Sequence, residues 1–193
     1  MAARLPVWLI LLGALAWAAR LPAGRAQQPE VDQEYLLKAG YLATFGRYTV
    51  WPQAGVPGGQ FVIGVLGKNP FGAVKADMEK LEIDKKKVVV REFKSMKDFQ
   101  PCHILFVSNA PAGDNPKEQA ADRLASALTA LNKKPVLLVA DSPGLAAKGA
   151  MLNLYLDMNK VKYEINVEAI KSAGLAPKAD LQKYGKPVTS EKK

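Results

Sequence analysis

The chain has 193 residues, with 27 basic and 18 acidic side chains and a formal net charge of +9. Its lysines do not alternate with aromatic residues, as a groove for single-stranded nucleic acid would require, so we expect no nucleic-acid partner and only peripheral contact with an anionic membrane surface. A single cysteine and a single histidine exclude an internal disulfide and, within one copy of the chain, a zinc site made of these two residue types.

Residues 1–26 have the pattern of a signal peptide. Arg4 precedes an apolar run at 6–19, and small residues follow at 24–26. The run is shorter than the roughly 20 residues that span a bilayer, although a retained membrane anchor stays open as the alternative. We therefore expect export to the periplasm, one α/β domain over residues 27–175, and a basic, flexible tail over 176–193.

The first expected element is a helix that follows Asp32, its predicted N-cap. Large side chains recur at helical spacing from Leu37 onward, and Pro52 ends the segment. Two explanations remain open for its aromatic residues: burial in the core, or contact with a partner or a second copy of the chain. The aromatic residues concerned are Tyr41, Phe45, Tyr48 and Trp51.

The middle of the chain alternates between strands and helices. Apolar runs predict strands at 61–67, 86–93, 103–108 and 135–140, and helices are expected at 70–81 and 115–131. This alternation indicates a parallel sheet covered on both faces.

The last part of the pattern differs. Two alternating runs around Met158 and Asn159 predict an antiparallel hairpin, and a short helix at 168–173 ends at Gly174. The expected fold is therefore three-layer α/β, with a mostly parallel sheet of Rossmann-like or flavodoxin-like order and a C-terminal hairpin.

Asp141 follows a predicted strand in a D-x-x-G turn, a position that holds magnesium in many nucleotide hydrolases. The phosphate-binding loop that such enzymes need is absent, because the glycines at 64 and 67 are too close together and Asn69 replaces the metal-binding hydroxyl. Cys102 and His103 are neighbours on a strand, so their side chains point to opposite faces and cannot form a catalytic dyad. We expect no enzyme activity, no metal and no cofactor.

Polar residues do follow three of the predicted parallel strands, and ligands bind beyond this edge in open parallel sheets. Either these residues form a ligand pocket or they serve only as turn residues, because their types also favour turns. The candidates are Lys68, Asn69, Ser108, Asn109, Asp141 and Ser142.

Four segments in this order resemble the YfiR family of exported bacterial proteins: 35–52 (YLLKAGYLATFGRYTVWP), 61–72 (FVIGVLGKNPFG), 102–108 (CHILFVS) and 135–175, which begins PVLLVADSPG. The resemblance covers about residues 35–175. It implies a periplasmic regulator that tends to dimerise and that represses an inner-membrane diguanylate cyclase, thereby restraining cyclic-di-GMP production and biofilm formation.

On this basis the expected partner is the periplasmic domain of a membrane signalling protein, either a cyclase or a sensor kinase. The alternative is a sensor or carrier of a small anion or nucleotide-like molecule that uses the strand-end pocket. Some relatives pair the cysteine of the CHILF motif in a disulfide; Cys102 has no partner in this chain, so only a bridge between two molecules stays open.

Overall fold

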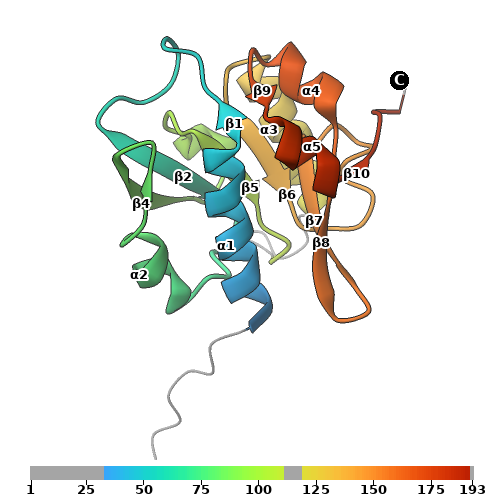
Figure 1. Ribbon diagram of the computed structural model, residues 1–193, viewed down its shortest axis with the longest axis horizontal. Helices are drawn as coiled ribbons and strands as arrows, with labels where there is room; N and C mark the ends of the chain where they lie inside the picture. The colour runs from blue at the N-terminus through green and yellow to red at the C-terminus, as the bar shows by residue number, and fades with distance from the viewer. Residues whose placement is uncertain (1–32, 111–118, 192–193) are drawn as a thin grey trace, which may run out of the picture. The chain divides into compact units, whose positions relative to one another are not determined.

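The fold is a mixed α/β arrangement built around one long sheet (Figure 1), and the computed structural model describes residues 33–110 and 119–191. Five parallel strands form most of this sheet, and the central ones are apolar runs because a strand covered on both faces buries nearly every side chain. They are β2 (Gln60–Leu66), β4 (Lys86–Phe93), β5 (Ile104–Val107), β6 (Leu137–Ala140) and β7 (Leu152–Asp157).

Three shorter or antiparallel strands complete this sheet, whose order is β10-β8-β7-β6-β5-β2-β4-β3. β8 (Lys160–Ile165) pairs antiparallel with β7, across a turn in which Met158 and Asn159 both have positive φ. β3 (Glu82–Ile83) pairs antiparallel with β4, and β10 (Lys186–Pro187) pairs parallel with β8. A separate two-stranded sheet joins β1 (Thr49–Val50) to β9 (Ala176–Pro177).

Helices pack on the sheet, and Figure 1 shows α1 (Gln33–Arg47) in front of it and α3 (Ala120–Leu131) behind it. The remaining helical segments are short: α2 (Val74–Met78), α4 (Val167–Ser172), α5 (Ala179–Tyr184) and the 3₁₀ turn η2 (Met96–Asp98). The apolar core lies between the helices and the central strands, where β5 and β6 are buried along their whole lengths.

The expected strands are confirmed to within two residues at each end, whereas several helical boundaries differ. Instead of a helix from residue 70, Asn69 accepts a hydrogen bond from the Phe71 amide (2.9 Å), and α2 begins only at Val74. Likewise, α3 begins at Ala120, and the residues predicted to precede it lie outside the described ranges. Local turn chemistry therefore delays α2 after β2.

Residues 176–187 differ from the prediction of a flexible tail, because they form β9, α5 and β10. Leu181 of α5 is buried, and its carbonyl accepts a hydrogen bond of 2.8 Å from the Tyr163 hydroxyl. The lysines of this stretch also anchor it, because Lys178 Nζ donates to the Arg47 carbonyl at 2.6 Å and Lys186 pairs with Glu164 at 3.5 Å. The predicted signal peptide and the Asp32 cap lie outside the described residues.

Candidate functional site

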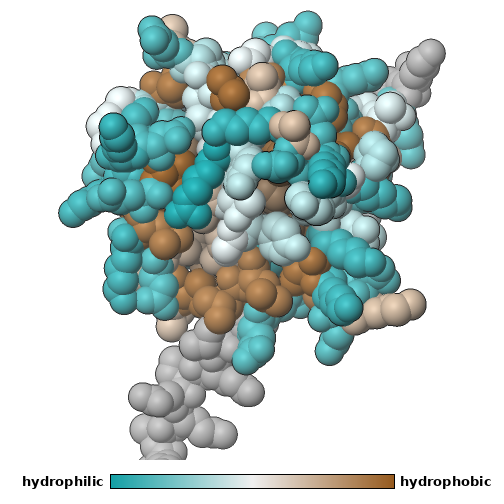
Figure 2. Space-filling model, in the orientation of Figure 1, coloured by the Kyte–Doolittle hydropathy of each residue, from teal (hydrophilic) through white to brown (hydrophobic). Residues whose placement is uncertain are grey.

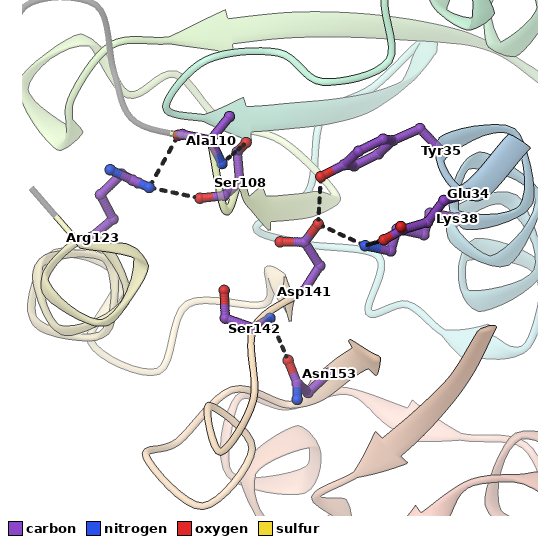
Figure 3. Close-up of polar contacts among 9 residues, drawn as sticks. All are labelled: Glu34, Tyr35, Lys38, Ser108, Ala110, Arg123, Asp141, Ser142 and Asn153. Atoms are coloured by element: carbon purple, nitrogen blue, oxygen red, sulfur yellow. Dashed lines mark hydrogen bonds and ion pairs between the residues drawn. The ribbon is translucent and has the colours of Figure 1, made fainter. Parts of the chain in front are cut away.

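Asp141 is the first residue after β6, and its side chain is fully buried beneath α1 (Figure 3). Its Oδ2 accepts hydrogen bonds from Lys38 Nζ at 3.0 Å and from the Tyr35 hydroxyl at 3.2 Å. Lys38 is itself buried and also pairs with Glu34 one helical turn earlier. The carboxylate therefore connects the end of a central strand to the first turns of α1.

The other carboxylate oxygen, Oδ1, accepts no hydrogen bond from the described residues, and neither does the buried Ser142 hydroxyl have a partner among them. The Ser142 backbone amide donates to Asn153 Oδ1 at 3.2 Å, which holds the turn against β7. Burial raises the pKa of Asp141, while the charge and hydrogen bond of Lys38, the Tyr35 hydroxyl and, more weakly, the Asn109 amide oppose that rise. This is the environment of an anchoring ion pair.

The other candidate residues from the strand ends do not share one pocket with Asp141. Lys68 and Asn69 line an open cavity of about 540 Å³ together with Lys75 and Lys94. The Ser108 carbonyl accepts a hydrogen bond of 2.8 Å from the buried Arg123. Its hydroxyl accepts one of 3.1 Å from the Ala110 amide, while Asn109 is exposed.

Sequence reasoning missed Tyr35, Lys38 and Arg123. For Lys38 a signal was present, since it precedes Leu42 by four positions and Phe45 by seven, which places it on the buried face of α1. A lysine in the middle of an apolar helical face predicts a buried partner. Nothing local in the sequence says that this partner is Asp141, about one hundred residues away.

A cavity of about 920 Å³ forms a groove between α1 and the C-terminal segment, which we call the α1–α5 groove. Tyr41, Thr44 and Tyr48 form its wall on α1 and share one face of that helix. The predicted aromatic stripe therefore divides: Tyr41 and Tyr48 line this groove, whereas Phe45 is buried in the core. The core is contacted instead by the face that carries Lys38, Leu42 and Phe45.

The opposite wall of the α1–α5 groove comes from β7, β8, α5 and β10. Tyr155, Tyr163 and Tyr184 supply aromatic surface, and Lys162 and Lys186 supply positive charge beside Asp180. The Tyr41 hydroxyl donates to the Val161 carbonyl at 3.0 Å. Burial raises the pKa of Tyr163 to about 12, so this phenol stays neutral.

The four aromatic candidates separate into three environments. Tyr41 and Tyr48 line the groove, whereas Phe45 is fully buried and packs against Tyr163 with ring centroids 5.1 Å apart. Trp51 lies away from the groove, against Phe61 and His103. Contact with a partner in this conformation is therefore open to the two tyrosines and to part of Trp51.

Cys102 and His103 are both buried, 1% exposed each. Burial raises the pKa of the Cys102 thiol to about 12, and burial together with the Lys86 charge lowers the pKa of His103 to about 4. At neutral pH the thiol is protonated and the imidazole is neutral. A bridge between two molecules through Cys102 would first require this strand to be exposed.

Neither a metal cluster nor a membrane-spanning helix is found within residues 33–110 and 119–191. No group of three or more histidine, cysteine, aspartate or glutamate side chains converges there. None of the helices in these ranges is both long and apolar enough to cross a bilayer.

A model of the family described as YfiR/HmsC-like matches residues 35–186. No curated protein matches the sequence. The matched region begins near the start of α1 and extends through α5 to β10, so it includes both walls of the α1–α5 groove.

Proposed function

Because the chain belongs to the YfiR/HmsC-like family, we propose that it is a periplasmic regulator that represses an inner-membrane signalling protein of the diguanylate cyclase type. The family is associated with periplasmic regulation of signalling. In this proposal the protein binds the periplasmic domain of the cyclase and thereby restrains cyclic-di-GMP production and biofilm formation.

The observation that carries the proposal is the α1–α5 groove. Tyrosine is enriched in protein interfaces because it combines a large contact area, few rotatable bonds and a polar end. Five tyrosines line this groove, whereas the chain's single cysteine and single histidine lie elsewhere. The composition favours recognition of another molecule over catalysis.

Exposed apolar residues extend this surface. Leu36 and Leu37 of α1 are 47% and 53% exposed, and Leu156 of β7 is 49% exposed. Figure 2 shows apolar surface along the lower edge of the same face, where α1 begins in Figure 1. We assign this edge and the groove to one partner-binding face, on which a second copy of the chain is the competing occupant.

The order of the parallel strands also supports a finer fold assignment. Along the sheet they follow as β4, β2, β5, β6 and β7, which in chain order is second, first, third, fourth, fifth. This is the flavodoxin-like order of doubly wound three-layer folds, in which ligands bind where the order reverses. Here the reversal lies between β2 and β5.

A second candidate function, a small-anion sensor or carrier, rests on the cavity near that reversal. Lys68, Lys75 and Lys94 surround it, with Glu92 as the acidic member of the lining. Inorganic phosphate or AMP that raised the melting temperature of the protein would favour this function. Loss of the shift in Lys75→Gln would place the ligand there.

The regulatory function is tested by deleting the gene and measuring cyclic-di-GMP. We expect the level to rise and to return when the wild-type gene is restored. Unchanged cyclic-di-GMP in a deletion strain with an intact cyclase would contradict the proposal.

Variants then test the binding face. Tyr184→Ala combined with Lys162→Glu changes two exposed groove residues and should abolish repression. Lys162→Glu also removes an exposed ion pair with Asp157, so the melting temperature should fall only slightly. Leu128→Ala on α3, which is 36% exposed and outside the groove, is the matched control and should repress normally.

A further inference from the structure

Another cavity, partly open to solvent, lies at the end of the sheet where β2, β4 and β5 begin. It is a cavity of about 320 Å³ beneath the loop that follows Trp51, and Phe61, His103 and Lys86 form part of its lining. None of these residues belongs to the α1–α5 groove.

His103 holds a hydrogen-bond donor in this cavity that the described residues do not use. Its Nδ1 accepts a hydrogen bond from the Val62 amide at 3.1 Å, so the proton of the neutral ring is on Nε2. Nε2 is buried and has no partner among the described residues. A buried donor without an acceptor is unfavourable unless a water molecule or a ligand supplies one.

The walls on either side of His103 are flat and aromatic. The imidazole stacks on Phe61, with ring centroids 4.3 Å apart and planes 19° apart, and Trp51 meets it edge-on at 5.4 Å. The Trp51 indole N–H donates to the Gly46 carbonyl at 3.0 Å, which fixes the orientation of that ring. The aromatic lining is therefore positioned before any ligand arrives.

The charged side chains at the cavity restrict the net charge of a ligand that can bind there. Lys86 supplies one positive charge and, within the described ranges, donates one hydrogen bond, to the Pro57 carbonyl at 3.4 Å. Asp84, two positions earlier, supplies one negative charge. A singly charged ligand matches this lining, whereas a doubly charged phosphate would also face the Asp84 carboxylate.

We propose that this cavity binds a small, flat monocarboxylate, with one carboxylate oxygen accepting from His103 Nε2 and the ring lying against Trp51 and Phe61. The volume is at the lower end of the range for ligand pockets, which suits a molecule of about ten non-hydrogen atoms. The site does not depend on the regulatory role proposed above.

Benzoate is a suitable probe, because the chain has only one histidine and its imidazole resonances can be followed without assignment. In long-range ¹H–¹⁵N spectra of the full chain at pH 7, benzoate should shift the Nε2 resonance saturably. For so small a ligand we expect a dissociation constant on the order of 1 mM. Benzyl alcohol, which lacks the charge, should bind at least about fivefold more weakly because it forgoes the attraction to Lys86.

Variants identify the binding site. Lys86→Gln should weaken benzoate binding at least about fivefold, whereas Lys87→Gln, whose side chain points to the other face of β4, should leave it unchanged. His103→Asn retains an acceptor for the Val62 amide, removes the Nε2 donor and should weaken binding, as measured by benzoate-dependent quenching of tryptophan fluorescence.

Three results would overturn the proposal: no saturable shift with benzoate, equal weakening by Lys86→Gln and Lys87→Gln, or tighter binding of phenyl phosphate than of benzoate. The comparison of Lys86→Gln with Lys87→Gln remains a test even if the His103 variant does not fold. Lys86 is only half-buried, so we expect Lys86→Gln to fold.

Discussion

The ion pair between Lys38 and Asp141 is the contact that a single residue change tests most directly. Both side chains are buried, at 4% and 0% exposed, and Lys38 also pairs with Glu34. Lys38→Met leaves the Asp141 carboxylate buried without a counter-charge and should lower the free energy of unfolding by about 3–5 kcal/mol, measured by urea denaturation. Asp141→Asn should lower it by less, because Lys38 keeps its ion pair with Glu34. The double variant Lys38→Met, Asp141→Leu should lower the free energy of unfolding by much less than the sum of the two single changes.

The exposed pair Lys80–Asp77 is the matched control, because its side chains are 76% and 64% exposed. Lys80→Ala should change stability by no more than about 1 kcal/mol. If Asp141→Asn left both stability and repression at wild-type values, Asp141 would be a turn residue only.

His103 predicts how stability depends on pH. Its pKa is about 4 in the folded protein, against 6.5 for the free side chain. The unfolded chain therefore binds a proton between these values while the folded protein does not. Above pH 6.5, His103 makes its full contribution to the free energy of unfolding. This free energy falls by about 3 kcal/mol as the pH drops to 4.

The measurement is urea denaturation of the wild type and His103→Asn across that pH range. The difference between them should shrink as the pH falls, which separates His103 from Asp141, whose raised pKa acts in the opposite direction. An NMR titration midpoint of His103 near 6.5 would contradict the prediction.

At the scale of elements, the two glycines of α1 should respond with opposite signs. A methyl group at Gly40 would meet nothing within 4 Å, so Gly40→Ala should stabilise the protein by up to about 1 kcal/mol through helix propensity. A methyl group at Gly46 would lie 2.9 Å from both Ile83 Cδ1 and Phe61 Cζ, which are buried. Gly46→Ala should therefore not stabilise, and overpacking predicts a lower melting temperature.

Thermal unfolding of the two variants, side by side, checks this prediction. Equal stabilisation by both would mean that α1 does not pack against β2 and β3 as closely as described.

The elements show where sequence reasoning succeeds and fails. Strands such as β2 were predictable because long apolar runs have few alternatives. α1 was predictable as a helix, but its two apolar faces were not separated. Leu37 faces solvent beside the groove, while Lys38 is buried against Asp141, which is distant in sequence. α5 could not be recognised, since one buried leucine anchors six residues.

For the molecule as a whole, the C-terminal segment is predicted to be part of the folded domain. A chain ending after Leu175 would lack β9, α5 and β10, lose the partner of the Tyr163 hydroxyl and expose the edge of β8. We expect this chain to unfold without a cooperative transition, or to aggregate. A chain ending after Val188 keeps these contacts and should unfold cooperatively.

A point variant tests the same assembly without removing residues. A methyl group on Gly185 would lie 2.5 Å from Tyr163 Cε2 and 2.7 Å from Ile165 Cγ2. Gly185→Ala should destabilise the protein by about 1–3 kcal/mol, and Gly58→Ala, with nothing within 4 Å, should not. A normal cooperative transition in calorimetry of the chain that ends after Leu175 would show that residues 176–193 are dispensable for folding.

The overall strand pattern was accessible from sequence, since alternating strands and helices imply a parallel sheet. The candidate site was less accessible, because its residues meet only through tertiary contacts. Tyr41 was identified as a candidate from helical spacing. Tyr163 and Tyr184, on the opposite wall, belong to segments that showed no local sign of such a role.

The pairing of β1 with β9 has a consequence for the time course of folding. Thr49 pairs with Pro177 and Val50 with Ala176, so residues near the two ends of the described chain close one small sheet. Contacts between such distant positions form slowly and late, because the intervening chain must first lose its freedom. Since the two walls of the α1–α5 groove come from the same two ends, we expect the groove to be completed last. Only a fully folded molecule would then bind the partner.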